Sequence, residues 1–309
     1  FLTYIAFHRF LYINLKDSRK VFWGGAFLVA QPYMIGLSIF VFTDMTAILF
    51  MILASLSFVR RRVILFGLFM MAAILSRQYI AFLALAAGTY FLVDFVRVRR
   101  RSSLYMLLSA VVSVIPYVLL AIWWGGPTPD NTMQFRYLDY GFTFNAHAFN
   151  LYISLIWIYG FPLLLFYLKQ FYTDIRIWVV SVFAAGFYFL FPVGPSQPTI
   201  NVGISTVGLF HRLLKALMLN EFWIQVLFSV AFVLAMPVVI RLVRDCWSRC
   251  RRHVHDTPMF LDLAILAFFV IMPFSYLSWE KYLMPLMPLF ILRVLLADWQ
   301  PAITKRIQI

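Results

Sequence analysis

Long apolar runs alternate with short clusters of arginine and lysine along the chain, and one stretch shows the pattern clearly. An apolar run at 41–59 is followed by the triple arginine at 60–62 and by a second apolar run at 63–76. Arginine-rich turns between apolar helices favour the cytosolic side of a membrane. The stretch therefore predicts a helical hairpin whose outer ends carry Asp44 and Arg77 together to the non-cytosolic face.

The same alternation continues over the rest of the sequence and predicts about eleven transmembrane helices, all in one transmembrane domain, 1–309. The predicted spans are residues 1–15, 21–42, 41–59, 63–79, 80–96, 104–124, 147–168, 177–193, 222–240, 258–277 and 283–297. Several are shorter than the roughly 20 residues that a perpendicular helix needs, which predicts broken helices or a thinned bilayer around a cavity. With these spans, every basic cluster lies in the cytosol.

Residues 204–219 are left out of the span count because their pattern is amphipathic. His211, Arg212 and Lys215 share one side of the expected helix, and leucines occupy another. Such a segment is typical of a helix that lies in the membrane interface. The fold class that we expect is therefore an all-α polytopic membrane protein with an additional interfacial amphipathic helix.

Composition supports this class. Of the 309 residues, 63% are hydrophobic and 12% are charged, and the mean hydropathy is +0.88, whereas about a quarter of the residues in soluble domains are charged. The net charge of +14 comes mainly from the short clusters between apolar runs, where basic residues set topology and contact anionic lipid. We expect membrane lipid as a partner and no nucleic acid. Because the sequence begins inside an apolar run, we also expect it to be incomplete at the N-terminus.

A second group of polar residues lies in the turn before the last predicted span. Glu280, Lys281 and Tyr282 occupy this turn, and the span order places it on the same face as Asp44 and Arg77. Charged groups beside membrane spans are costly and often mark a functional site. For each residue alone, a structural ion pair or an interfacial anchor remains the simpler interpretation.

Cysteine and histidine offer one further candidate. Cys246, Cys250, His253 and His255 are zinc-ligand types, but they fall in one basic stretch and lack the paired spacing of zinc knuckles. We expect this stretch to be a cytosolic loop with no disulfide framework, and we expect no metal site.

Several short motifs resemble one family. They are Pro32 twelve residues before Asp44, the dipeptide of Arg77 and Gln78, Gly141 and His147 before Phe161 and Pro162, and Glu280, Lys281 and Tyr282 with Pro285. In order and membrane side, this set is similar to the dolichyl-phosphate-glucose-dependent alpha-1,2-glucosyltransferases of the N-glycan precursor pathway, members of the GT-C membrane glycosyltransferases. Two features depart from the family: Lys281 replaces an arginine, and 194–220 lacks an Asp-Asn-Arg-His-Tyr run.

The resemblance implies a GT-C-type hexosyltransferase without a cofactor, in the endoplasmic reticulum membrane of a eukaryote or the plasma membrane of a prokaryote. A polyprenyl-phosphate sugar, with glucose expected, would be the donor, and a lipid-linked oligosaccharide the acceptor. The implied donor-phosphate or substrate-binding residues are Asp44, Arg77, Gln78, His147, Glu280, Lys281 and Tyr282. In the family the catalytic base lies on the first external loop, which we expect upstream of residue 1.

The chemistry of sugar transfer agrees with these residue types. Departure of a phosphate requires cations, and arginine binds phosphate in two-point fashion, so Arg77 is the residue expected at the donor phosphate. The alternative is a secondary transporter or a lipid flippase. A transporter would place its ionisable groups near the middle of the membrane on discontinuous helices, whereas the sequence predicts that Asp44, Arg77 and Glu280 lie in loops at one face.

Overall fold

The computed structural model describes residues 1–39, 43–126, 144–167, 171–201, 203–217, 220–275 and 277–297. Helices make up 84% of these described residues, which contain no strand. The α-helices are α1 (Leu2–Leu15), α2 (Ser18–Val29), α3 (Pro32–Ile39), α4 (Thr43–Val59), α5 (Val63–Ser76), α6 (Ala81–Val98), α7 (Arg101–Trp124), α9 (Ala146–Phe166), α11 (Ile175–Leu190), α12 (Gln197–Asn201), α13 (Leu209–Ala216), α14 (Glu221–Arg251), α15 (Thr257–Ile271) and α16 (Met287–Leu296). Three short 3-10 helices complete the described chain: η1 (Gln78–Ile80), η3 (Met272–Phe274) and η4 (Glu280–Leu286).

Five helical segments of the described chain are long and apolar enough to cross a membrane. They are Gln78–Val98, Arg101–Trp124, Ala146–Phe166, Glu221–Arg251 and Thr257–Phe274. A sixth is obtained if α2 and α3 form one span, since they are bent by 70° at a short break. An all-α protein with five or six helices that could span a membrane is therefore confirmed. The count of eleven stays a prediction, because α4, α5 and α11 are apolar but shorter.

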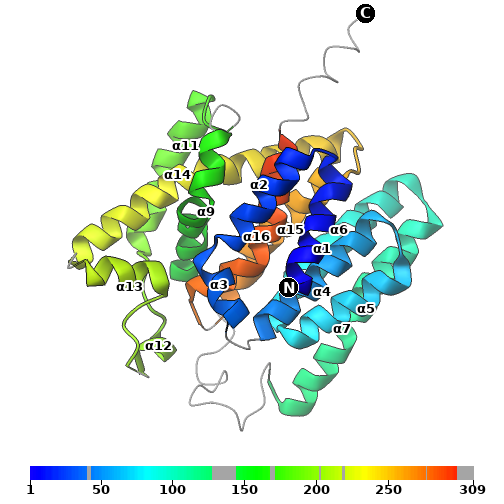
Figure 1. The fold of residues 1–309 in the computed structure, drawn as a ribbon, viewed down its shortest axis with the longest axis horizontal. Helices are drawn as coiled ribbons and strands as arrows, with labels where there is room; N and C mark the ends of the chain where they lie inside the picture. The colour runs from blue at the N-terminus through cyan, green and yellow to red at the C-terminus, as the bar shows by residue number, and fades with distance from the viewer. Residues whose placement is uncertain are drawn as a thin grey trace, which may run out of the picture.

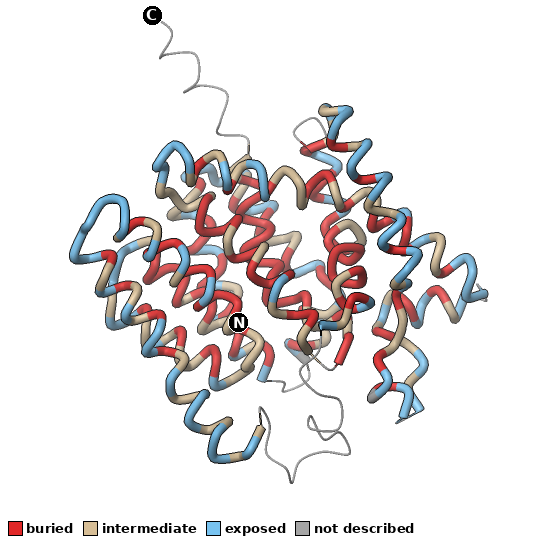
Figure 2. Tube along the Cα trace, turned by 180° about the vertical axis from the view of Figure 1, so that it is seen from behind, coloured by how far each residue is buried: buried red, intermediate tan, exposed pale blue. Residues whose placement is uncertain are grey.

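The helices form two groups that meet along a central layer. Figure 1 shows α4, α5, α6 and α7 on one side, α9, α11, α13 and α14 on the other, and α2, α15 and α16 between them. Burial increases toward this centre, as the tube in Figure 2 shows. The short helix α16 is buried on nearly all sides. With ten residues it is also too short to span a bilayer unaided. Its place in the fold is therefore that of a core element.

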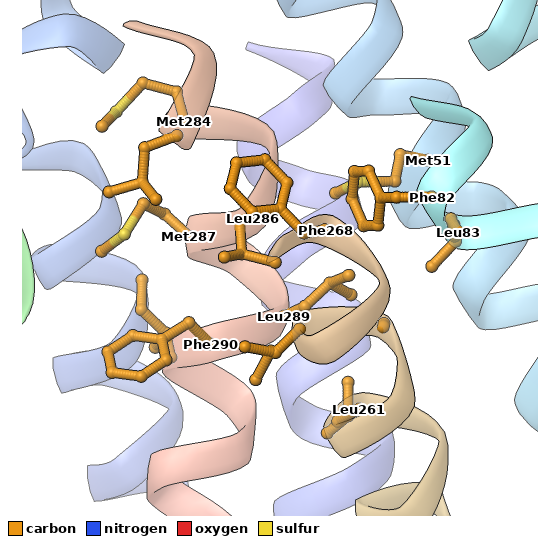
Figure 3. Close-up of a cluster of buried hydrophobic side chains, with 14 of the residues drawn as sticks. Met51, Phe82, Leu83, Leu261, Phe268, Met284, Leu286, Met287, Leu289 and Phe290 are labelled. Atoms are coloured by element: carbon orange, nitrogen blue, oxygen red, sulfur yellow. The ribbon is translucent and has the colours of Figure 1, made fainter. Parts of the chain in front are cut away.

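Aromatic and aliphatic side chains fill the space around α16. In Figure 3, Phe290 of α16 and Phe268 of α15 lie in one cluster with Phe82 of α6, and all three are fully or almost fully buried. Gly24 of α2 permits a close approach to the same layer, because a Cβ atom there would lie 2.7 Å from Leu295 Cδ1. Dense packing of this kind fixes the relative positions of the helices, and so also of the polar groups at their ends.

The basic turns gather at one end of the molecule, which we call the basic end. Arg61 Nη2 lies 3.8 Å from Asp94 Oδ2, and Arg97 Nη1 donates to the Cys250 carbonyl at 2.5 Å. These contacts join the ends of α4, α6 and α14. Thr3, in the first turn of α1, donates to the Met45 carbonyl at the start of α4. Because α1 and α4 pack together and begin at the same end, Asp44 lies at the end opposite to the basic one.

Two local expectations were wrong. The helix predicted to end at residue 240 continues as α14 to Arg251, so Cys246 and Cys250 lie in a helix and not in a loop. The extension buries Leu242, Cys246 and Arg249 against the rest of the fold. Ion pairs accompany it, since Arg241 Nε lies 3.1 Å from Asp245 Oδ1 one turn later and Arg244 pairs with Asp174 of the neighbouring segment.

The amphipathic segment is shorter than expected, and its histidine faces the protein. The segment predicted at 204–219 forms only α13, Leu209–Ala216. His211 is buried, whereas Leu209 and Leu213 are exposed. The outward leucines form an apolar surface that suits contact with lipid.

Candidate functional site

Asp44 and Arg77 form an ion pair between the first turn of α4 and the residue that ends α5. Arg77 Nη2 donates a hydrogen bond of 2.9 Å to Asp44 Oδ2, and Nε lies 2.8 Å from Oδ1 without the alignment of a hydrogen bond. A carboxylate in the first turn of a helix is favoured by the helix dipole. Asp44 is buried, while 28% of the Arg77 side chain is exposed. The pair therefore holds a partly accessible guanidinium at this end of the molecule.

Aromatic side chains connect this ion pair to the turn before α16. Tyr79 donates a 2.7 Å hydrogen bond to Asp44 Oδ1, and its ring centroid lies 5.2 Å from that of Tyr282. Tyr282 stacks with Trp279 at 5.9 Å, and Lys281 Nζ lies 4.7 Å from the centre of the Trp279 ring. Asp44, Arg77, Tyr79, Trp279, Lys281 and Tyr282 are called the cation site below.

The two cations of this site are electrostatically coupled. Burial lowers the pKa of the Lys281 ammonium, Asp44 opposes that shift, and Arg77 adds to it. Burial also acts to lower the pKa of Arg77, but Asp44 together with Tyr79 and Tyr282 outweighs it, so the net pKa of Arg77 is raised. Two positive groups within reach of one carboxylate form a favourable environment for an anion such as phosphate.

Glu280 lies beside the cation site in the chain but has a different role. Its side chain is fully buried, with 0% exposed. Oε2 accepts from Tyr159 Oη at 2.7 Å, from the Phe210 N–H at 2.8 Å and from Tyr33 Oη at 3.2 Å, while Oε1 accepts from the His211 N–H at 3.0 Å. These four donors satisfy both carboxylate oxygens, and two of them are backbone N–H groups in the first turn of α13, where a negative charge is favoured by the helix dipole. Glu280 therefore anchors the start of α13.

Gly208 and His211 complete this anchor. A Cβ atom on Gly208 would lie 2.5 Å from Tyr33 Oη and 2.6 Å from the Glu280 side chain, so only glycine fits. His211 Nδ1 accepts from the Val207 N–H at 3.2 Å, and burial lowers the pKa of this imidazole. Tyr33, Tyr159, Gly208, Phe210, His211 and Glu280 are called the glutamate clamp below. Pattern analysis missed Tyr33 and Tyr159, because single tyrosines in apolar runs are common.

The remaining predicted residues lie in several places. Gln78 follows Arg77 directly as the first residue of η1 and is partly buried. His147 is the second residue of α9, and its Nδ1 lies 2.6 Å from the Pro192 carbonyl oxygen. Its ring also contacts Phe191, so its contacts join α9 to the segment after α11. Gly141, which is part of the family resemblance, lies outside the described residues.

Buried charges inside the apolar helices were not singled out from the sequence. Arg293 of α16 contacts Asp262 of α15 at 2.5 Å and Asp245 of α14 at 3.0 Å. Asp94 of α6 lies 3.2 Å from His255 Nδ1 and accepts from Ser103. Each is visible in the sequence as a charge within or beside an apolar run, which is the usual signal of an interior polar contact.

Within the described ranges, no group of three or more His, Cys, Asp or Glu side chains is arranged to hold a metal ion. The four zinc-ligand side chains around Cys246 and Cys250 do not converge on one point: His253 contacts Arg97, and His255 contacts Asp94. Comparison of the chain with known protein families, characterised proteins and solved structures gave no match.

Proposed function

We propose that the protein is a membrane glycosyltransferase that moves a sugar, with glucose expected, from a polyprenyl-phosphate donor to a lipid-linked oligosaccharide on the non-cytosolic face. The observation that carries this proposal is the cation site. Arg77 and Lys281 come from helices far apart in sequence and are coupled through Asp44 at the end opposite to the basic turns. That end would face the lumen of the endoplasmic reticulum in a eukaryote, or the outside of the plasma membrane in a prokaryote.

The proposed mechanism assigns the leaving phosphate to the two cations. Arg77 and Lys281 stabilise the negative charge that grows on the phosphate as the glycosidic bond breaks. Asp44 orients the guanidinium, and the stacked rings of Trp279 and Tyr282 provide an apolar face for a sugar ring. Glu280 is not proposed as the base that accepts the acceptor proton, because four donors already occupy its carboxylate.

A transporter or lipid flippase without transferase activity is the second candidate, and a specific observation favours it. Asp262 and Arg293 are buried inside helices, and α2 and α3 form a broken pair. Ionisable groups within the membrane and discontinuous helices are features of transport pathways. The same pair also fits a purely structural contact, because both partners are satisfied by each other and by Asp245.

The decisive experiment is a transfer assay with purified full-length protein, a polyprenyl-phosphate-glucose donor and a lipid-linked oligosaccharide acceptor. Arg77→Lys keeps the charge but loses the planar fork, so at limiting donor it should reduce transfer sharply. Arg60→Lys, at the opposite end, is the matched control and should leave transfer unchanged. Normal turnover by Arg77→Lys would remove Arg77 from the mechanism. Absence of any transfer by the wild type, together with donor-independent lipid movement, would favour the second candidate.

A further inference from the structure

A groove of about 580 Å³ is lined by residues of α2 and α9 and by Leu295 of α16. Its volume falls in the range of sites that hold a lipid-sized or drug-sized ligand. One wall is a single stripe of α2, formed by Arg19, Trp23, Ala26 and Ala30 at helical spacing. The two alanines leave the room that larger side chains would fill.

Contacts between α2 and α9 bound the groove at the end next to Ala30. Just beyond Ala30, Gln31 Nε2 donates a 3.1 Å hydrogen bond to the Tyr159 carbonyl, which ties α2 to α9. The Tyr33 and Tyr159 rings meet edge to face at 6.0 Å on the same side. An elongated molecule in the groove would therefore enter from the other end, where α2 begins.

The open end is cationic and the rest is apolar. Arg19 and Lys20 lie in the first turn of α2, and Asp17 caps that turn by accepting from both of their backbone N–H groups. This turn follows α1, whose start lies near Asp44, so it belongs to the basic end. Farther along, the walls are apolar and include Pro162 and Leu163 of α9.

We propose that this groove binds an acyl chain of an anionic glycerophospholipid, with the lipid phosphate at Arg19 and Lys20. Basic groups at the cytosolic side of spaces between membrane helices are suited to anionic lipid headgroups. The lipid in this groove would not be the polyprenyl-phosphate donor, because the phosphate of the donor would lie at the cation site, at the opposite end of the fold. The groove is thus a second lipid site, independent of the proposed transferase reaction.

Fluorescence quenching by lipids with brominated acyl chains tests the proposal, because Trp23 lines the groove. The full chain is reconstituted into bilayers that contain brominated phosphatidylglycerol or brominated phosphatidylcholine at equal mole fraction, and the Trp23 signal is the difference from a Trp23→Phe variant. We expect stronger quenching by phosphatidylglycerol. In an Arg19→Gln, Lys20→Gln double variant this preference should fall, by about fivefold for each basic residue removed.

Two further variants separate the groove from general attraction to the membrane. Arg60→Gln with Arg62→Gln removes two charges from the same end but outside the groove, and the preference should persist. Ala26→Phe with Ala30→Phe fills the groove while Arg19 and Lys20 remain, and the preference should disappear. Equal loss in both charge variants, or retained preference after the groove is filled, would overturn the proposal. Thermal unfolding of each variant verifies that it is folded.

Discussion

Asp44 and Glu280 are both buried carboxylates at helix starts, but their donors give them different parts in the protein. Asp44 accepts from a cation and a phenol, so it can position Arg77 while the guanidinium remains partly exposed. Glu280 accepts from two phenols and two backbone N–H groups. A backbone N–H cannot rotate to another acceptor as a side chain can, so the Glu280 carboxylate has a structural role.

Glu280→Gln should destabilise the protein because an amide N–H₂ would replace one accepting oxygen. With one orientation it would face the backbone N–H of Phe210, and with the other that of His211, so one buried donor would lose its acceptor. Leaving a buried donor unsatisfied costs about 1 to 3 kcal/mol. Thermal unfolding in detergent should show the loss.

The matched control for that experiment is Glu221→Gln. Glu221 begins α14, and its exposed carboxylate lies 3.8 Å from Lys215 Nζ. Exposed ion pairs contribute little to stability, so this variant should unfold at nearly the wild-type temperature. An equal effect of the two substitutions would show that the glutamate clamp does not stabilise the fold.

At the scale of elements, α13 illustrates how a short helix is held by tertiary contacts. Eight residues are too few for a stable isolated helix, and α13 depends on Glu280 at its N-terminus and on the buried His211. Lys215 donates to the Ser205 carbonyl and so closes the segment on itself. Docking of α13 should therefore respond to any change in the charge of His211.

Acid should release α13. Burial lowers the pKa of His211 below its ordinary value of 6.5, Lys215 adds to the shift and Glu221 opposes it. A histidine with a lowered native pKa is neutral when docked and takes up a proton more readily when released. The stability of docking is complete above pH 6.5 and falls as the pH drops toward the lowered value. Hydrogen-exchange protection of residues 207–217, measured against the intrinsic rate at each pH between 7.5 and 5, should show this.

His211→Asn is the control for the acid response. Asparagine offers an acceptor oxygen to the Val207 N–H but does not titrate in this range. Protection in this variant, measured against the intrinsic exchange rate at each pH, should be nearly independent of pH over the same interval, even if docking is weaker throughout. An acid response as large as that of the wild type would assign the effect to another group.

Buried charges also connect the helices α14, α15 and α16. Arg293 contacts both Asp262 and Asp245, so one arginine joins three helices. Arg293→Leu would leave Asp262 buried without its cation, which costs about 3 to 5 kcal/mol. The double variant Arg293→Leu with Asp262→Leu should recover most of that loss, because no charge would remain unpaired. Thermal unfolding of both variants measures the difference, and a double variant less stable than the single one would contradict this account.

At the scale of the whole molecule, the fold has two polar ends with different chemistry. Arginine contacts to Asp94, Cys250 and Asp174 define the basic end. The cation site and the glutamate clamp lie at the other end, since Asp44 begins a helix that runs to the basic turns. This polarity is what the charge pattern predicts for a chain in a membrane.

The orientation can be tested by labelling with a membrane-impermeant thiol reagent after Cys246 and Cys250 are replaced by alanine. His147→Cys and Asn201→Cys occupy exposed positions toward the cation-site end, and they should react only from the non-cytosolic side. Arg60→Cys and Arg100→Cys are exposed at the basic end and should react only from the cytosolic side. Reaction of both pairs from one side would contradict the predicted topology.

The sequence by itself determined the class of the protein and the pairing of Asp44 with Arg77. Long apolar runs must form helices, because backbone polar groups in a bilayer have no other partners. The triple arginine between two such runs then places their far ends together. The same reasoning grouped Lys281 and Tyr282 with Asp44 and Arg77, and the contact of Tyr282 with Tyr79 brings them together, although residues 280–286 form the 3-10 helix η4.

Only the tertiary structure decided what each polar group does there. Glu280 and Lys281 are adjacent in the chain, yet one anchors α13 and the other joins the cation site, because their side chains meet different helices. The extension of α14 past residue 240 and the burial of His211 likewise depend on partners distant in sequence, such as Asp174 and Glu280. Hydrophobic periodicity reports which residues avoid water, but the partner of a buried charge is set by how the helices pack.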